Sequence, residues 1–178
     1  VGWGENTYGQ TTVPSGTFTH VAAGSCHSLA IRVDGTLVGW GCNFDGQTNV
    51  PEGTFIAVST FNDHSLAIRN DGMLLVWGKN DAGHLNLPTG TFTAVAAGNS
   101  HSLAIRTEGT LVGWGANYAG QINVPSGTFT AVASGSVHGL AIRSDAPTPD
   151  PALRLLVNSA FKPGSNTLAV KLPVTSDG

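Results

Sequence analysis

The chain has few charged residues, and very few of them are basic. Asp, Glu, Lys and Arg make up 11% of the 178 residues, and Lys and Arg together account for only 8. In an average soluble protein about a quarter of the residues are charged. Four of the basic residues occupy one repeated position, so no basic cluster is present. Because affinity for duplex nucleic acid depends on neutralising phosphates, we expect no nucleic-acid partner.

Long apolar runs and helical periodicity are also missing. No run approaches the roughly 20 apolar residues of a membrane-spanning helix, so we expect no membrane span. No segment keeps a 3.6-residue apolar period for long enough to predict a helix. Apolar residues nevertheless make up 40% of the chain and recur regularly, which excludes a disordered chain. This composition, with 24 Gly, is typical of a tightly turned all-β protein.

Motifs of catalysis and cofactor binding are absent from the sequence. It contains no nucleophile elbow, phosphate-binding loop or zinc-binding motif. The acidic residues fall mostly in turns. We therefore expect a protein that is not an enzyme and that needs no cofactor. The chain starts Val1-Gly2-Trp3, without Met and without a visible signal peptide, so we expect a processed or trimmed chain.

What the chain does contain is an internal repeat with a period of 37 residues. Three full copies span 17–53, 54–90 and 91–127, and half copies span 1–16 and 128–145. A fixed period of this size indicates a solenoid, a propeller or an array. The residues that recur without gaps are Trp3, Trp40, Trp77 and Trp114; His27, His64, His101 and His138; and Arg32, Arg69, Arg106 and Arg143.

Each copy contains about four short apolar segments rich in β-forming residues. In the third copy they are 92–97, 101–106, 111–115 and 121–124, punctuated by Gly, Asn, Asp or Pro. A two-residue turn, Asp-Gly or Glu-Gly, separates the second segment from the third. Four antiparallel strands in one repeat match one propeller blade. We therefore predict an all-β propeller of four-stranded blades, with the Ala-Ala-Gly segments nearest the axis.

One motif recurs in register along the chain. It reads Ala-Ala-Gly, two residues, His-Ser-Leu-Ala-Ile-Arg, Asp-Gly, and Trp-Gly-x-Asn-x-x-Gly-Gln. It resembles the repeat of the regulator of chromosome condensation family, in the short bacterial form similar to a secreted β-lactamase inhibitor protein. The resemblance covers 1–145 and implies a β-propeller, with seven blades usual in the family. This chain supplies about four blade-equivalents, so a four-bladed ring, a ring of two chains and a piece of a larger propeller remain open.

The recurring residues are expected to serve the scaffold. Each Trp should pack between adjacent blades, and each His should hydrogen-bond a neighbouring turn. A metal ring of His is not expected, because equivalent atoms on separate blades diverge and metal ligands must converge within about 2 Å of one ion. The Arg residues should close strand ends or pair locally. The Asn residues of the loops should make side-chain turns; these are Asn6, Asn43, Asn80 and Asn117.

The only two Cys residues occupy positions that should face each other. If Asp34-Gly35 centres a hairpin, Cys26 and Cys42 fall almost opposite each other at its open end. We predict that they reach disulfide distance; two free thiols and a metal-binding pair are the alternatives. In the next copy, Asp63 and Lys79 hold these positions and are expected to pair. A disulfide favours an oxidising compartment, so we expect a secreted or cell-surface protein.

The loop between Trp-Gly and Gly-Gln differs from copy to copy. Variable loops on a rigid scaffold are where binding is usually built, and exposed aromatic side chains are typical anchors of an interface. The alternative is that the rings only cover blade edges. The predicted binding residues in these loops are Tyr8, Phe44, Asp45, Lys79, Asp81 and Tyr118.

The second copy departs most from the pattern. Phe61 stands where the other copies have Gly, Ser59-Thr60 replace two small residues, and His84 replaces Gln. If that Gly position requires a positive φ, Phe61 must distort the turn. We expect Phe61 and His84 to mark the most asymmetric spot, where a bulky group plugs a channel or forms a local pocket.

The repeat stops after Arg143. The Pro-rich segment 146–151 is predicted to be a stiff linker. Alternation in 167–174 and the apolar stretch 153–161 predict a β-hairpin within 152–178, or the start of a further domain. A lone hairpin is marginally stable, so it should pack on another element or another subunit.

These features lead to three hypotheses of function. The first is a secreted or surface-exposed module that binds a protein partner through its aromatic loops. The second is a subunit that self-associates through open blade edges and the tail hairpin. The third is a carbohydrate-binding propeller in which each loop takes a glycan.

Overall fold

The computed structural model describes residues 1–81, 83 and 86–144. Val1–Ser144 forms one compact unit. The predicted linker 146–151, the predicted hairpin 152–178 and His84 lie outside the described residues.

The described residues fold entirely into β-strands, turns and loops, which confirms the predicted fold class. The strands are β1 (Phe18–Ala23), β2 (His27–Arg32), β3 (Leu37–Gly41), β4 (Phe55–Phe61), β5 (His64–Arg69), β6 (Leu74–Gly78), β7 (Phe92–Ala97), β8 (His101–Arg106), β9 (Leu111–Gly115), β10 (Phe129–Ser134) and β11 (Gly139–Arg143).

Each full repeat forms one antiparallel sheet of three strands, in the order β1-β2-β3, β4-β5-β6 and β7-β8-β9. The last half copy forms the two-stranded sheet β10-β11. The middle strand of each full sheet has the sequence His-Ser-Leu-Ala-Ile-Arg and is buried along most of its length. Neighbouring sheets cover both faces of β5, since Ala67 packs at the junction with the first repeat and Leu66 at the junction with the third.

The fourth segment of each copy was predicted to be a strand, and this is wrong for the part of the chain that the structure describes. In the first copy, residues 47–50 form turns, in which the amide of Asn49 donates to the carbonyl of Gly46 at 3.0 Å. The segment crosses the third strand closely: a Cβ on Gly39 would lie 3.0 Å from the carbonyl oxygen of Thr48. Its amides bond to Asn43, Gly46 and Thr48 of the same loop, so they do not extend the sheet.

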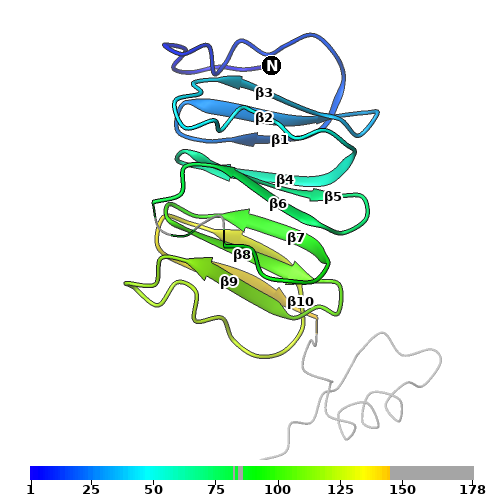
Figure 1. Cartoon of the computed structure of the whole chain (residues 1–178), viewed down its shortest axis with the longest axis vertical. Coiled ribbons are helices and arrows are strands. Elements are labelled where there is room, and N and C mark those ends of the chain that lie inside the picture. The colour runs from blue at the N-terminus through cyan, green and yellow to red at the C-terminus, as the bar shows by residue number, and fades with distance from the viewer. Residues whose placement is uncertain (82, 84–85, 145–178) are drawn as a thin grey trace, which may run out of the picture. The chain divides into compact units, whose positions relative to one another are not determined.

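Neighbouring sheets are stacked on one another along the unit (Figure 1). The first strands of successive sheets contact each other, β1 with β4, β4 with β7, and β7 with β10. Small side chains permit this approach; Ala96 and Ala97 at the end of β7 are both buried. The Ala-Ala-Gly segments therefore lie on the side where the sheets are nearest, which is the position predicted for them relative to a propeller axis.

The hydrophobic core lies between the sheets. One cluster fills the junction of the first and second repeats and is formed by Ile31, Leu37, Phe55 and Ala67. A second cluster fills the junction of the second and third repeats and is formed by Leu66, Ile68, Leu74, Phe92, Ala97, Ala104 and Trp114. Each repeat therefore depends on its neighbours for burial, as expected of a repeat architecture.

The two ends of the blades differ in construction. At the end that we call the turn end, residues 33–36 and their counterparts in the later copies join the second strand to the third. The carboxylate of Asp34 accepts from the amide of Thr36 at 2.9 Å. This hydrogen bond, with one from the Thr36 hydroxyl, holds the pKa of the carboxyl below its ordinary value.

Arg side chains close the strands at the turn end, as predicted. The guanidinium of Arg106 lies over the ring of Phe92 at 5.4 Å and donates to the carbonyl of Thr89. Equivalent pairs are Arg32 with Phe18 and Arg143 with Phe129. In the second copy Arg69 instead pairs with Asp71, its Nε donating to the carboxylate at 2.9 Å.

Candidate functional site

The predicted binding residues that the structure describes gather at the opposite end, which we call the loop end. The first strand of each sheet ends there, and the second begins there after a short turn. The third strand also ends there and continues into the variable loop. In the first copy this places the turn 24–26 beside the loop 42–47. Antiparallel pairing therefore collects both the turn and the loop of every repeat on one face.

Cys26 and Cys42 form a disulfide bond at the loop end, with Cα atoms 5.5 Å apart. The amide of Cys42 also donates to the carbonyl of Cys26 at 2.8 Å. The hairpin register that was predicted from Asp34-Gly35 therefore brings the two sulfur atoms together. The bond ties the variable loop of the first copy to the turn that precedes β2.

The variable loops are held rigid from inside. In the first copy, Asn43 donates to the side chain of Asn49 at 2.8 Å and accepts from the amide of Thr48 at 2.9 Å. The side chain of Gln47 is fully buried and accepts from the amide of Asp45 at 2.8 Å. Asn117 and Gln121 make the corresponding bonds in the third copy. The recurring Asn residues make side-chain turns as predicted, and their φ angles are not positive.

Two aromatic rings meet on the surface of the loop end. The centroids of Tyr8 and Phe44 are 5.5 Å apart and their planes are perpendicular. Tyr8 is 49% exposed and Phe44 is 75% exposed. Tyr118, in the loop of the third copy, is 70% exposed. The structure thus joins two of the three predicted aromatic residues into one pair, which we call the aromatic pair.

The charged residues of the loops take different partners from those expected. Lys79 was predicted to pair with Asp63, but its ammonium contacts the carboxylate of Asp81 at 3.0 Å. Asp81 follows Lys79 in the same loop and reaches it without crossing the hairpin. Asp45 is exposed beside the aromatic pair.

Phe61 changes the turn in the second copy, but not because the Gly position requires a positive φ. The Gly at this position in the first copy, Gly24, has no positive φ. It provides clearance instead, because a Cβ there would lie 2.4 Å from the ring of His27. In the second copy Phe61 adds one more pair to the hairpin, with His64, and Asn62 takes the positive φ of 49°.

The Phe61 side chain borders a local hollow. It lies against the core between the second and third repeats. With residues of the neighbouring turn it lines a hollow of about 260 Å³.

A line of buried polar contacts joins the repeats, and sequence reasoning found only part of it. His27 contacts Ser65 of the next sheet, Nε2 to Oγ, at 3.1 Å. Ser65 donates to the carbonyl of Gln47 at 3.0 Å, and Trp77 donates to the same carbonyl at 2.8 Å. The Ser column was not singled out, although its 37-residue spacing was visible. His27, His64 and His101 thus bond to a neighbouring sheet rather than to a neighbouring turn.

The hydrogen bonds around His27 define its protonation. Thr60 donates its hydroxyl proton to the carbonyl of His64 at 2.7 Å, and Ser65 donates its own to Gln47. His27 Nε2 must therefore carry the proton that it shares with both hydroxyl oxygens. Its Nδ1 is buried without a partner. Burial lowers the pKa of His27 to about 4, because a second proton on Nδ1 would find no acceptor.

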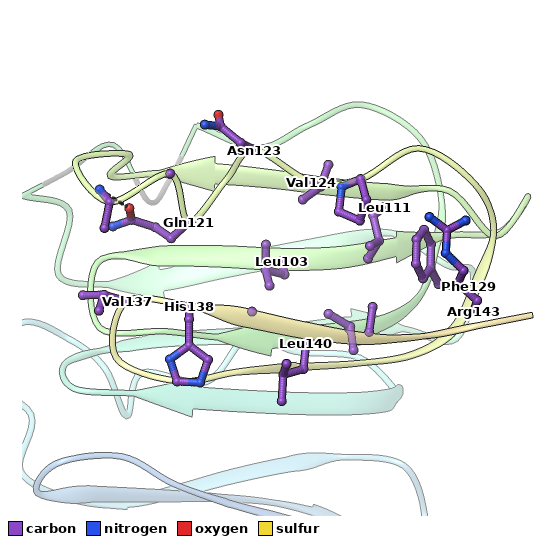
Figure 2. A pocket seen from close by; sticks show the side chains of 16 residues that line it. Leu103, Leu111, Gln121, Asn123, Val124, Phe129, Val137, His138, Leu140 and Arg143 are labelled. Carbon is purple, nitrogen blue, oxygen red and sulfur yellow. Dashed lines mark hydrogen bonds between the residues drawn. The ribbon is translucent and has the colours of Figure 1, made fainter.

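The outer sheets of the unit expose apolar side chains. Residues of β8, of the loop 119–125 and of β11 line a hollow of about 420 Å³. Figure 2 labels Leu103, His138 and Leu140 among the residues that line it. At the first sheet, Trp3 and Val21 border a hollow of about 490 Å³. Trp3 is 83% exposed, so the prediction that every Trp packs between blades is wrong for this one. In the part of the chain that is described, no sheet lies over it.

Within the described residues, no helix is long and apolar enough to cross a membrane.

The comparison with known families follows the repeats. The model of the regulator of chromosome condensation (RCC1) repeat matches residues 18–47, 56–83 and 92–121. No curated protein matches the chain at a significant level.

Solved structures with the same fold come from yeast and plants. Prp20p of Saccharomyces cerevisiae is 18% identical, with a TM-score of 0.67 over 88% of this chain and 54% of its own. Yeast RCC1 (Prp20) bound to Kap60 is 20% identical, with a TM-score of 0.64 over 75% of this chain and 44% of its own. The ectodomain of the Physcomitrella patens receptor kinase CR4 is 21% identical, with a TM-score of 0.65 over 75% of this chain and 40% of its own.

The chain spans about half the length of these structures. At 18–21% identity, the likeness to these structures is a likeness of fold. The motif recurs three times in register, and the matched repeats extend from residue 18 to residue 121. Each of these copies forms its own sheet of three antiparallel strands. The chain therefore belongs to the regulator of chromosome condensation (RCC1) repeat family and has the repeats of an RCC1-type β-propeller.

Proposed function

We propose that the chain is a non-enzymatic, secreted or surface-exposed protein-binding module whose partner docks on the loop end of the blades. The observation that carries this proposal is the aromatic pair. Tyr8 and Phe44 come from successive repeats, yet they touch each other and remain exposed. Two large rings held together on a surface form an apolar anchor that a partner can cover.

The rigidity of the loops supports the same proposal. Binding costs free energy when side chains and loops must become ordered. The loops that carry Tyr8 and Phe44 are already ordered by Gln side chains, since the half-buried Gln10 and the buried Gln47 accept from loop amides at 2.9 and 2.8 Å. Aromatic side chains lose little conformational entropy when they are covered. The loop end is therefore organised before a partner arrives.

The charges of the loops indicate the kind of partner. Their acidic residues are Glu5, Asp45 and Asp81, and their only basic residue is Lys79, which is paired with Asp81. An acidic rim around an aromatic anchor favours a partner with an apolar groove edged by Lys or Arg.

Two further observations fit this proposal. Among the similar structures, yeast RCC1 (Prp20) is bound to Kap60, and Prp20p has been studied for its binding to Gsp1p and histones. The Cys26–Cys42 disulfide is the kind of bond that persists in an oxidising compartment, which fits secretion or the cell surface.

A displayed library of random peptides tests the protein-binding proposal without knowledge of the natural partner. The wild-type chain should enrich peptides that combine aromatic or aliphatic residues with Lys or Arg. The double variant Tyr8→Ala/Phe44→Ala should lose these peptides, while Met73→Ala should keep them. Met73 is an exposed apolar residue at the turn end and serves as the matched control. Selected peptides that bind the double variant as well as wild type would contradict the proposal.

Self-association is the second candidate function, because both outer sheets expose apolar residues. Trp3 and Val21 are exposed on the first sheet, and Leu140 and Ile142 on the last. A second copy that stacked its first sheet on the last sheet of its neighbour would cover both. Light scattering of wild type and Leu140→Lys tests this: a concentration-dependent rise in mass should be lost in the variant. A wild-type monomer at all concentrations would exclude it. Glycan binding stays a prediction, which competition by free sugars in the peptide assay would test.

A further inference from the structure

We propose that the reduced chain binds one thiophilic divalent cation, such as Zn²⁺, through Cys26, Cys42 and Asp63 at the junction of the first and second repeats. The two sulfur atoms and a carboxylate oxygen of Asp63 all lie within 4.8 Å of one another. Two thiolates and a carboxylate are a ligand set that zinc accepts. In the oxidised chain the disulfide occupies both sulfur atoms, so the site exists only after reduction.

The fold brings Asp63 to the disulfide because equivalent positions of successive repeats lie side by side. Cys26 and Asp63 occupy the same position of the first and second copies. The amide of Ser25 donates to the carbonyl of Asn62 at 3.1 Å, which joins the two turns directly. The short turn after Phe61 thus sits against the turn of the first copy and presents the carboxylate to the sulfur atoms.

The spacing suits tetrahedral coordination. Zn–S bonds of about 2.3 Å and Zn–O bonds of about 2.0–2.2 Å place neighbouring ligand atoms of a tetrahedron about 3.5–4 Å apart. The Cα atoms of the two Cys residues are 5.5 Å apart, so rotation of the side chains separates the sulfur atoms without moving the backbone. Three protein ligands leave the fourth position for water or for a group of a partner.

A buried amide is already directed at one of the ligands. Gln47 Nε2 donates to Cys42 Sγ at 3.3 Å, and Gln47 is fully buried. Hydrogen bonds of this kind orient a ligand and stabilise its charged form. The Lys79 ammonium, which stands near the site, is bound by Asp81 at 3.0 Å. The carboxylate of Asp63 therefore stays available to a cation.

The redox chemistry needs an external dithiol reductant. The dithiol supplies two electrons and two protons; the S–S bond breaks, two thiols form, and the reductant leaves as its own disulfide. The cation then displaces the two thiol protons to solvent and forms two metal–sulfur bonds. Only the first copy offers this site, because the third copy has Ser100 and Ala116 in place of the two Cys residues.

The test uses the full chain, which is reduced by a phosphine and then separated from it by gel filtration without oxygen before the metal is added. Phosphine and water convert the disulfide into two thiols and a phosphine oxide, and Co²⁺ is then titrated as the probe. We expect a thiolate-to-cobalt charge-transfer band and tetrahedral visible bands that saturate at one Co²⁺ per chain and disappear when Zn²⁺ is added. The oxidised chain should show neither band.

The variant Asp63→Asn separates this site from an ordinary pair of thiols. It should raise the Kd for Co²⁺ by about tenfold or more, as loss of even an outer contact commonly does. Glu52→Gln, the matched control on an exposed acid that precedes β4, should leave the Kd unchanged. Equal affinities of wild type and Asp63→Asn would overturn the proposal, as would a reduced, folded chain without cobalt bands. If reduction unfolds the chain, Zn²⁺ should restore its circular dichroism spectrum; failure to do so would also overturn it.

Discussion

The turn end and the loop end of the blades are made from the same repeat but are stabilised in different ways. At the turn end, three of the four Arg residues lie over a Phe ring at nearly the same distance, 5.2–5.4 Å. At the loop end, one repeat has a disulfide, another has an ion pair and a third has Ser and Ala. The scaffold therefore allows one end to vary while the other stays constant.

The reason for this difference lies in which atoms make the contacts. The loops are ordered by Asn and Gln side chains that bond to backbone atoms, so the outward side chains of the loop take no part in its stability. At the turn end, the side chains themselves form the contact. Substitution of the exposed side chains of the loops should therefore affect binding more than stability, whereas substitution of the Arg residues at the turn end should affect stability.

The largest effect is expected from removing the disulfide at the loop end. It joins residues separated by 16 positions. Closing a loop of this length stabilises a protein by about 3 kcal/mol. The double variant Cys26→Ser/Cys42→Ser should lower the free energy of unfolding by that amount, as measured by urea denaturation without added metal. A decrease in the free energy of unfolding well below 1 kcal/mol would show that the other contacts stabilise the loop end without the disulfide.

Acid should weaken the junction between the first and second repeats. The pKa of His27 is about 4 in the folded chain, below its ordinary value of 6.5. The unfolded chain therefore binds the proton first, so stability is complete above pH 6.5 and falls as the pH drops towards 4. At pH 5 the loss is about 2 kcal/mol. Urea denaturation of wild type and His27→Gln between pH 4 and pH 7 should show a steeper loss of stability in wild type than in the variant; equal slopes would contradict it.

At the turn end, Arg106→Ala should lower the free energy of unfolding by about 1–2 kcal/mol. It removes a contact between a cation and an aromatic ring together with a hydrogen bond to a carbonyl. Arg69→Ala is the matched control, because Arg69 pairs with the exposed Asp71 and should matter less. Thermal unfolding of the two variants compares them directly, and a larger effect for Arg69 would contradict the importance of the Phe ring.

The smallest effect on stability is expected from the exposed ring of Phe44. Phe44→Ala should change the free energy of unfolding by no more than about 1 kcal/mol, since it removes only the edge contact with Tyr8. The same variant should nevertheless lose most of the affinity for peptides selected on the wild-type chain. Circular dichroism melting and peptide binding by interferometry measure the two effects. A strongly destabilised variant would mean that the ring supports the scaffold.

Much of the fold could be predicted because it depends on the period. The spacing of Trp, His and Arg located the copies, and the segments around 92–97, 101–106 and 111–115 became β7, β8 and β9. The fourth segment was assigned to a strand because its composition is rich in β-forming residues. Turn bonds within 47–50 and the close crossing at Gly39 decided otherwise. This crossing depends on where the third strand lies relative to the segment 47–50, and the sequence of the segment alone does not predict that position.

The candidate site could be predicted in its parts but not in its arrangement. The register of one hairpin was enough to bring Cys26 and Cys42 together, because both lie in the same copy. Pairing between copies was beyond that reasoning: Tyr8 meets Phe44, and Asp63 lies beside Cys26 and Cys42. These contacts depend on how far apart neighbouring sheets stand, which follows from the packing of the core.

The sequence by itself determined the repeat, the first three strands of each copy, the hairpin turns and the family, because each of these follows from residues that recur at the same position in successive copies. Only the tertiary structure decided what lies between copies. It placed the aromatic pair on one surface, buried His27 against Ser65 and set Asp63 beside the disulfide. The physical reason is that a sheet of this size cannot bury its own faces. The stacking of neighbouring sheets therefore determines which side chains of different copies meet.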